Sequence, residues 1–222
     1  LGVAGLQGMG QLDLFLSIFG IVPLSRGSLF VDGKHVAIAS PQDAISARIG
    51  ISLVPEDRKT EGLFLKLNGK HNATIPIIDR FVRHGLIDKA LETDAVEQIF
   101  RRVEVDGRAL WSRADAFSGG NQQKIAIAKW LLSESHILMV YDPTRGIDVG
   151  TKNELYQLLR GYAEAGGAVI FYSTEVPELV HLADRVMVFY AGEVGAELSG
   201  SDLTEENILS AALGTSNKAT AA

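Results

Sequence analysis

The second half of the chain alternates short apolar runs with stretches whose apolar residues recur at helical spacing. Apolar runs such as 137–141 and 169–172 predict buried strands, because a strand covered on both faces has no polar side. The expected order is strand 137–141, helix 150–164, strand 169–172, helix 176–183, strand 185–190, an edge strand 193–198 and a helix 205–213. Such alternation predicts a parallel sheet with right-handed crossovers.

The first half begins with a similar strand and helix and continues with a predicted hairpin. Residues 1–4 predict a strand, and 11–19 predict a helix with one apolar face. The runs 28–31 and 35–38 are separated by Asp32-Gly33, which is a strong signal for a hairpin turn.

A further helix and strand follow this hairpin. The helix starts at Ser40, a capping residue followed by Pro41 and by the acidic Asp43 three positions on, and it runs to about Arg48. The apolar run 51–54 predicts the next strand.

The middle of the chain lacks strand signals. The polar run 56–62 predicts a loop, and 68–116 is expected to be mostly helical. One apolar stripe of that stretch consists of Leu91, Ala95, Ile99 and Val103. We therefore predict four parts: a first core segment 1–67, a helical subdomain 68–116, a second core segment 117–213, and a disordered tail 214–222.

Composition excludes several classes of function. The 222 residues include 21 basic and 27 acidic side chains, a net charge of −6 that argues against a nucleic-acid surface. Cysteine is absent, which excludes disulfides and thiolate metal sites and fits a reducing compartment. No apolar run is long enough to span a bilayer, and no signal peptide is visible.

Two glycine-rich turns precede predicted helices. The first, Gly5-Leu6-Gln7-Gly8-Met9-Gly10, joins the first strand to the helix at 11–19. The second is Ser118-Gly119-Gly120, followed by Asn121 and Gln122 in the helix that runs to Ser133. Glycines let the backbone approach a ligand, and free N–H groups at a helix start attract anions. The alternative for the second turn is an ordinary serine cap.

The order of these segments resembles the ATPase domain of ABC transporters. The segment Ser118-Gly119-Gly120-Asn121-Gln122-Gln123-Lys124 is similar to the signature motif of that family, and 136–144 resembles its Walker B strand. The resemblance implies an α/β fold of the P-loop NTPase, ABC-ATPase type. It consists of a mainly parallel sheet flanked by helices, a small inserted helical subdomain and an incomplete N-terminal antiparallel part.

Several positions depart from the family pattern around the first glycine turn. A phosphate loop carries a lysine that reaches the terminal phosphate and a hydroxyl that binds Mg²⁺, but Gln11 and Leu12 stand there. Asp13 follows and is a further candidate for this site. The missing charge is worth up to ~4 kcal/mol at a surface-like dielectric. Backbone amides alone would hold nucleotide weakly.

The positions that the resemblance implies for catalysis also depart from the family pattern, by losing a magnesium ligand or gaining an acid. Tyr141 stands where the family has the aspartate that supports Mg²⁺, and core packing is the favoured interpretation for it. Asp142 takes the place of the glutamate that positions water. Glu175 replaces the switch histidine, where its carboxylate would repel a phosphate, and Glu56 replaces the loop glutamine or is a solvated charge.

The resemblance therefore implies a division of labour between two ATPase domains. In ABC dimers the signature of one domain covers the phosphate loop of the other, and Asp148 belongs to the D-loop that crosses their interface. This chain would supply an intact signature to a partner's site while its own site is degenerate. ATP is the implied cofactor, with Mg²⁺ at the partner's site and no metal-ligating residues here.

Three segments narrow the resemblance to bacterial monosaccharide importers of the ribose, galactose and xylose type. They are 55–63, 118–124 and 143–150. In that family two ATPase domains are fused, so the chain is expected to be a C-terminal half lacking the first strands. The implied partners are the N-terminal ATPase domain, membrane permease subunits and, indirectly, a sugar-binding protein, with no nucleic acid. The implied location is peripheral, at the cytoplasmic face of the inner membrane, for a fragment that is itself soluble.

Three other classes of protein share part of this pattern. A nucleoside importer has a similar tandem ATPase. A non-transport ABC protein would carry a coiled coil or a basic linker, and a small-molecule kinase has no use for a signature motif.

Other residues with chemical potential are expected to be structural. The five histidines show no metal-site spacing. Trp111 and Trp130 are expected in the core, and Arg58 and Lys59 in a solvated loop.

Overall fold

A six-stranded sheet forms the centre of the protein in the computed structural model, which describes residues 1–46 and 48–215. Its strands lie in the order β10-β9-β1-β8-β7-β4, and every neighbouring pair is parallel except the antiparallel edge pair β10–β9. The strands are β1 (Gly2–Gly5), β4 (Ile51–Val54), β7 (Ile137–Tyr141), β8 (Ala168–Tyr172), β9 (Arg185–Tyr190) and β10 (Glu193–Ser199). The predicted fold class is confirmed.

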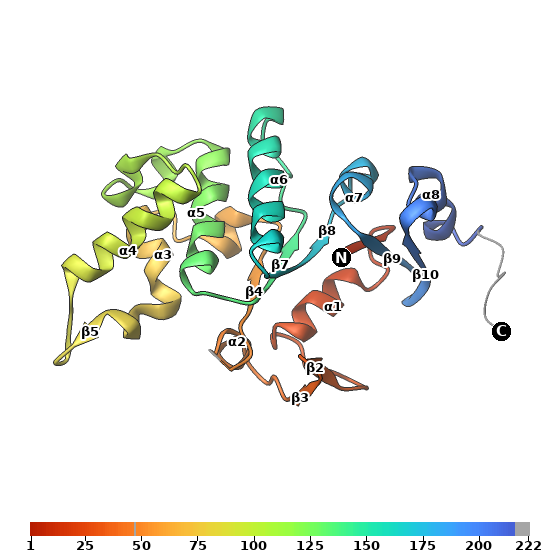
Figure 1. The fold of residues 1–222 in the computed structure, drawn as a ribbon, viewed down its shortest axis with the longest axis horizontal. Helices are drawn as coiled ribbons and strands as arrows, with labels where there is room; N and C mark the ends of the chain where they lie inside the picture. Colours follow the sequence, from red (N-terminus) through yellow and green to blue (C-terminus); the bar gives the residue numbers. More distant parts are fainter. Residues whose placement is uncertain (47, 216–222) are drawn as a thin grey trace.

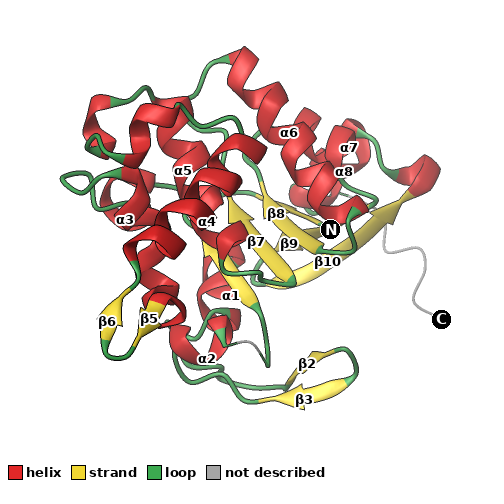
Figure 2. Cartoon of the chain, turned by 60° about the vertical axis from the view of Figure 1, so that its left-hand side comes forward, coloured by secondary structure: helices red, strands yellow, loops and turns green. Residues whose placement is uncertain are grey.

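Helices cover both sides of this sheet. The helices of the described residues are α1 (Gln11–Ile18), α2 (Pro41–Ile45), α3 (Gly69–Thr74), α4 (Lys89–Arg102), α5 (Gly119–Leu132), α6 (Val149–Glu164), α7 (Val176–Leu182) and α8 (Glu205–Ala212), of which α3 and α4 pack on α5 rather than on the sheet. Helices α6, α7 and α8 lie on one side, while α1 and α2 lie on the other (Figures 1 and 2). The helix α5 stands between α4 and α6 (Figure 1).

Two small hairpins lie outside the central sheet. The predicted one pairs β2 (Leu29–Val31) with β3 (Lys34–Val36). Its turn has positive φ at Asp32 (50°) and Gly33 (72°), as a tight two-residue hairpin turn requires. The second, β5 (Val82–Arg83) with β6 (Leu86–Ile87), interrupts the stretch that was expected to be mostly helical.

The buried apolar residues form two clusters that meet at α5. The larger one joins the sheet to its helices, and Ile127 and Trp130 of α5 belong to it. The smaller one packs α3 and α4 against the other face of α5, which contributes Ile125, Ala126 and Ala128. The helix that carries the serine-glycine motif therefore ties the two clusters together.

Two details differ from the expectations. The helix starting at Ser40 ends at Ile45 rather than near Arg48. Residues Arg58–Gly62 form a π-helical turn, with Asp57 as its cap, instead of an irregular loop. The remaining short turns are 3₁₀ segments, Ile75–Phe81, Gly107–Leu110, Ala114–Ala116 and Gly200–Asp202. The expected tail lies largely outside the described residues.

The stripe predicted for α4 is half right: Ile99 and Val103 are buried, whereas Leu91 is exposed and Ala95 is half-buried. The buried residues of the helix are Glu92, Val96, Ile99 and Phe100. Glu92 is buried because its carboxylate accepts from Lys70 Nζ at 2.8 Å and from the Thr74 hydroxyl at 2.8 Å. The apolar pattern could not show that a charged pair occupies the covered face.

The two tryptophans have different environments. Trp130 is buried as expected, while Trp111 is 66% exposed, so its expected place in the core was wrong. Lys70 Nζ lies 5.4 Å from the centre of the Trp111 ring, a cation–π distance that holds the indole at the surface.

Candidate functional site

The first glycine turn leads from β1 into α1. Gly5, Gly8 and Gly10 have φ values of 149°, 84° and 99°, and Gly10 stands at the N-cap of α1 with no side chain bonded to the first turn. Gly8 is exposed, with nothing near the position of a Cβ atom. The backbone N–H groups at this helix start can therefore receive an anion.

Gln11 lies inside this turn rather than above it. The residue is 1% exposed, and its Nε2 donates to the Leu6 carbonyl at 2.9 Å. A side chain on Gly5 would collide with that amide, so the glycine is needed for this close approach. The side chain at the lysine position is thus neutral and already bonded to the loop.

The residue at the position of the magnesium-binding hydroxyl does not fit Mg²⁺. Leu12 is 48% exposed and offers no oxygen, and Asp13 is exposed beside it on the helix. Met9 is half-buried, and its sulfur accepts from the Ala191 N–H at 3.3 Å. The backbone of this turn can contact a phosphate, and Asp13 carries the carboxylate among these side chains that could ligate Mg²⁺.

Tyr141 at the end of β7 is a core residue, as expected. Its ring stacks on Tyr172 with centroids 4.5 Å apart and meets Phe15 edge to face at 5.2 Å. Burial raises the pKa of the Tyr141 phenol to about 12, with the neighbouring Tyr172 and acidic groups adding to it. The phenol stays neutral at physiological pH and cannot replace a carboxylate as a magnesium ligand.

Asp142 follows in a left-handed conformation, with φ of 46°, and is 3% exposed. Its carboxylate accepts from the Thr174 hydroxyl at 3.1 Å and from the Thr174 N–H at 3.4 Å. Burial raises the pKa of Asp142 above its ordinary value, and the neighbouring carboxylates of Glu178 and Glu175 raise it further. A buried carboxyl with a raised pKa is suited to exchanging a proton with a water molecule.

Glu175 caps the start of α7, and its carboxylate pairs with the Lys152 ammonium of α6. The repulsion expected between this carboxylate and a phosphate stays a prediction, and the Lys152 ammonium beside it lowers the local negative charge.

Behind Glu175, the buried Glu178 carboxylate accepts from four side chains: Ser173 at 2.6 Å, Tyr156 at 2.6 Å, Thr144 at 3.0 Å and Lys152 at 3.3 Å. These bonds fix the segment after β7 to the segment after β8.

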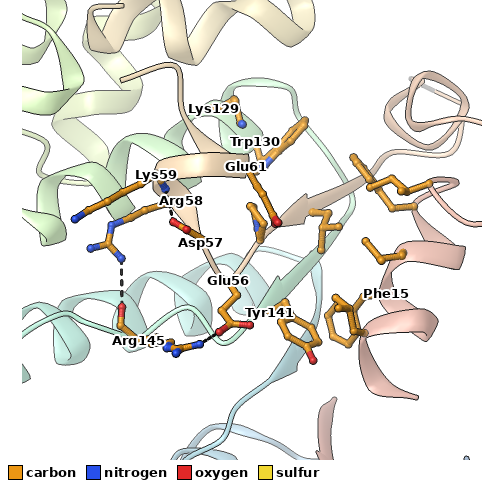
Figure 3. A pocket seen from close by; sticks show the side chains of 16 residues that line it. Phe15, Glu56, Asp57, Arg58, Lys59, Glu61, Lys129, Trp130, Tyr141 and Arg145 are labelled. Atoms are coloured by element: carbon orange, nitrogen blue, oxygen red, sulfur yellow. Dashed lines mark hydrogen bonds and ion pairs between the residues drawn. The ribbon is translucent and has the colours of Figure 1, made fainter. Parts of the chain in front are cut away.

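The segment after β4 is also attached to the segment after β7. The Glu56 carboxylate pairs with the Arg145 guanidinium, so Glu56 is a paired charge rather than a freely solvated one. Arg58 was expected in solvent, but it is only 7% exposed, and its Nη1 donates to the Arg145 carbonyl at 3.2 Å (Figure 3). Lys59 beside it is exposed, as expected.

The serine-glycine turn starts α5 as predicted. Ser118 is exposed and caps the helix, with its hydroxyl accepting from the Asn121 N–H at 3.4 Å. Gly119 is partly exposed, whereas Gly120 is buried and packs against Thr151, where a Cβ atom would lie 2.6 Å from the Thr151 hydroxyl. The accessible part of this helix start is therefore Ser118 and Gly119.

Two further residues hold the turn in place. The Asn121 side-chain oxygen accepts from the Asp106 N–H at 3.0 Å, and Gln122 is buried with its Nε2 donating to the Phe117 carbonyl at 3.0 Å.

Asp148 caps the neighbouring helix α6 through the Thr151 N–H at 3.0 Å and the Thr151 hydroxyl at 2.8 Å. Hydrogen bonds from the Thr151 N–H and hydroxyl lower the pKa of the Asp148 carboxyl, which stays ionised. Since Thr151 also contacts Gly120, the starts of α5 and α6 are packed together.

A cavity of about 820 Å³ opens between α1, the π-helical turn and the far end of α5 (Figure 3). Its apolar wall includes Phe15 and Trp130, and its rim carries charged side chains of both signs. Lys129 lies in this cavity, donates to the Gly62 carbonyl at 2.7 Å, and has a pKa lowered by burial to about 8.

Sequence reasoning missed Arg58, Lys152 and Glu178. Their partners Arg145, Glu175 and Thr144 lie on other elements, so no local spacing gave a signal. Among residues 1–46 and 48–215, no cluster of three or more His, Asp or Glu side chains could hold a metal ion. Within the same ranges, every helix is too short or too polar to cross a membrane.

Comparisons with known proteins agree on the family. The model of the ABC transporter family matches residues 1–145. The ribose import ATP-binding protein RbsA 1 of Rhizobium johnstonii is 45% identical over 213 residues, covering 96% of this chain and 42% of that protein. The xylose import ATP-binding protein XylG of Burkholderia ambifaria is 44% identical over 214 residues, covering 96% and 41%. The chain spans about two fifths of the length of these relatives.

Solved structures show the same fold at low sequence identity. A nucleotide-free ATP-binding cassette from an ABC transporter superposes with a TM-score of 0.79 at 18% identity, covering 94% of this chain and 83% of that one. A dimeric cassette in a post-hydrolysis state bound to ADP and Pi gives 0.75 at 20% identity, covering 89% and 84%. The glycine turn before α1, the serine-glycine start of α5 and these matches together show that the chain belongs to the ABC transporter family.

Proposed function

We propose that this chain is the C-terminal ATPase half of a tandem subunit in a bacterial monosaccharide importer. In this role it supplies Ser118 and Gly119 to a nucleotide held by the N-terminal ATPase domain of the same subunit. The ribose and xylose import proteins among its relatives, and the two fifths of their length that it spans, support this assignment.

The contrast between the two glycine turns carries the proposal. At the first turn, Gln11 is neutral and bonded to Leu6, Leu12 is apolar, and Tyr141 is in the core. At the second, Ser118 and Gly119 stand accessible at the start of a 14-residue helix. A site lacking both cation and metal ligands binds ATP weakly, whereas the second helix start can complete a partner's site.

The proposed partners follow from this division. Mg²⁺-ATP is held and cleaved mainly at the partner domain's phosphate loop, and Asp148 lies at the interface between the domains. ATP binding is coupled to the permease subunits, and a sugar-binding protein delivers the monosaccharide to them. The ATP-binding subunit is peripheral at the cytoplasmic face of the membrane. The longest helix between 68 and 116 is α4, with 14 residues, which favours this role over a non-transport protein with a coiled-coil insertion.

The experiment is a pair of substitutions in the full-length subunit assembled with its permease. Gly119→Trp fills the space at the start of α5, and we expect it to abolish ATP turnover, with at least a 100-fold loss of the kind seen when an anion-stabilising group is removed. Asp142→Ala alters the degenerate site, and we expect a loss of less than about fivefold because that site contributes little to turnover.

The matched control is Gly161→Trp on the exposed side of α6, where a Cβ atom meets nothing. Thermal unfolding midpoints separate loss of folding from loss of activity. If Asp142→Ala stopped turnover while Gly119→Trp did not, the roles of the two sites would be reversed.

We also propose that the cavity in Figure 3 and the segment 56–67 face the permease. Its apolar wall and mixed charged rim suit a short amphipathic helix. A photo-crosslinker placed at Lys59 should then link the chain to a permease subunit in assembled transporter. The same crosslinker at Glu193, on the edge strand β10, is the control and should give no permease adduct.

A further inference from the structure

Arg58 is a buried cation that forms no ion pair within residues 1–46 and 48–215. Its side chain comes from the π-helical turn after β4, and the residue is only 7% exposed. Nη1 donates to the Arg145 carbonyl at 3.2 Å, while Nε has no partner among the described residues. Burial lowers the pKa of this guanidinium, which indicates that its charge is poorly compensated.

The nearby carboxylates are bonded to other groups. Glu56 pairs with Arg145, Asp57 accepts from the Lys59 N–H at 2.8 Å, and Asp148 accepts from Thr151. No carboxylate in 1–46 or 48–215 lies within ion-pair distance of Arg58. An anion from outside the described residues would stabilise a buried guanidinium in this state.

Arg58 is aimed at the start of α5. A Cβ atom on Gly119 would lie 2.6 Å from its Nη2, so the guanidinium and the Gly119 backbone are in direct contact. The first turn of a helix carries about half a positive charge, and here a full positive charge stands beside it. Two like charges are held together by the fold, and Ser118 leaves this place open to the surface.

We propose that Arg58 and the Ser118-Gly119 helix start form one anion site, which takes the terminal phosphate of a nucleoside triphosphate held by the partner ATPase domain. This inference rests on the proposed function for the source of the phosphate. It adds a binding residue from a different element, 60 positions before the serine-glycine turn. A guanidinium suits this ligand because its planar set of N–H donors matches phosphate oxygens.

The test uses the full-length subunit and compares two ligands, ATP and ADP. Arg58→Met should lower kcat/KM for ATP hydrolysis at least tenfold. It should also lower the ATP preference, the ratio of the affinity for ATP to the affinity for ADP, by a similar factor, because only ATP carries the terminal phosphate. Arg58→Lys keeps the charge and should retain most of this preference. Lys34→Met, at an exposed lysine of the hairpin β2–β3, is the control and should change neither quantity.

A structural role for Arg58 predicts a different result. Misfolding lowers the affinities for ATP and ADP alike and is not rescued by a charge. Arg58→Gln keeps a donor for the Arg145 carbonyl but lacks the charge, so it serves if Arg58→Met fails to fold. Unchanged ATP preference in Arg58→Gln would overturn the inference.

The same assay separates the two proposals. If Gly119→Trp stops turnover and Arg58→Gln keeps the full ATP preference, only the role of Arg58 is wrong. If neither substitution has an effect, the proposed use of this helix start by a partner's nucleotide fails as well.

Discussion

The starts of α1 and α5 look alike in sequence and differ in what surrounds them. Both follow a strand or turn with glycines, and both present backbone N–H groups at a helix start. At α1 the next side chains are neutral Gln11, apolar Leu12 and acidic Asp13. At α5, the Arg58 guanidinium touches Gly119. We therefore expect the capacity to bind an anion to depend on the charge placed beside the glycines more than on their spacing.

The magnitudes support this order of importance. A helix start contributes typically 0.3–1 kcal/mol, and up to ~2 kcal/mol when partly buried, to binding of an anion. A full charge at about 4 Å contributes up to ~4 kcal/mol at a surface-like dielectric. The binding free energy that a loop lysine would contribute is therefore larger than the turn before α1 alone can supply. The turn before α5, in contrast, has a cation from another element.

Hydrolysis of ATP by the 222-residue chain alone would contradict the proposed difference between the starts of α1 and α5. We expect its turnover to be at least about 1000-fold below that of the full-length subunit, because each missing electrostatic contact lowers turnover by ~10²–10³. Steady-state phosphate release, with and without Mg²⁺, measures this. Turnover within tenfold of the full-length subunit would show that the turn before α1 is a working site.

Glu178 provides the next largest effect. Glu178→Ala leaves Lys152 and three hydroxyl donors without a buried acceptor, and should lower the free energy of unfolding by about 3 kcal/mol. Denaturant unfolding of the chain measures this value. Glu197→Ala, which removes an exposed pair with Arg185, is the control and should cost less than about 1 kcal/mol. A small effect of Glu178→Ala would mean that water replaces the carboxylate.

Apolar patterns predicted the sheet and most of its helices. The strands Ile51–Val54, Ile137–Tyr141 and Arg185–Tyr190 have the expected bounds, because their sequences leave no other place for so many apolar side chains. The turn at Asp32-Gly33 was readable because only a few residue types accept positive φ at both positions.

The charged interior was not readable from the sequence. Arg58, Glu92 and Glu178 are buried because each meets partners on another element, such as Arg145, Lys70 and Tyr156. Pattern reading places charges in solvent, so it assigned Arg58 to a loop and displaced the buried face of α4. The serine-glycine start of α5 was predicted, but the cation beside Gly119 was not.

Restoring a lysine to the first turn measures how much of the difference between the starts of α1 and α5 comes from this charge. Gln11→Lys should raise the affinity of the chain for ATP about tenfold, less than the full ion-pair energy because the lysine must leave the loop carbonyl to reach a phosphate. Mg²⁺ should add little, since Leu12 and Tyr141 still provide no ligand. Isothermal titration measures both affinities, and Gln7→Lys, at an exposed place in the same loop, is the control. Strong Mg²⁺ dependence in Gln11→Lys would contradict the assignment of a metal-free site.

The smallest expected effect concerns the far end of α5, where Lys129 meets the cavity. Its pKa of about 8 lies below the ordinary value for lysine because of burial, so between about pH 8 and 10 the unfolded chain binds more protons than the folded one. The free energy of unfolding contributed by Lys129 therefore rises with pH across this window. The charged form is the destabilising one, and its penalty is fully present below pH 8.

Lys129→Met removes this titration together with the bond to the Gly62 carbonyl. Relative to the unsubstituted protein, the variant should lose about 1 kcal/mol of stability between pH 7.5 and 9, because only the protein with Lys129 gains stability there. Denaturant unfolding at both pH values measures the difference, with Lys66→Met, at a largely exposed lysine, as the control. A pH-independent difference would mean that water reaches the Lys129 ammonium, so that the cavity wall at this end of α5 is wet although Ile127 and Trp130 beside it are buried.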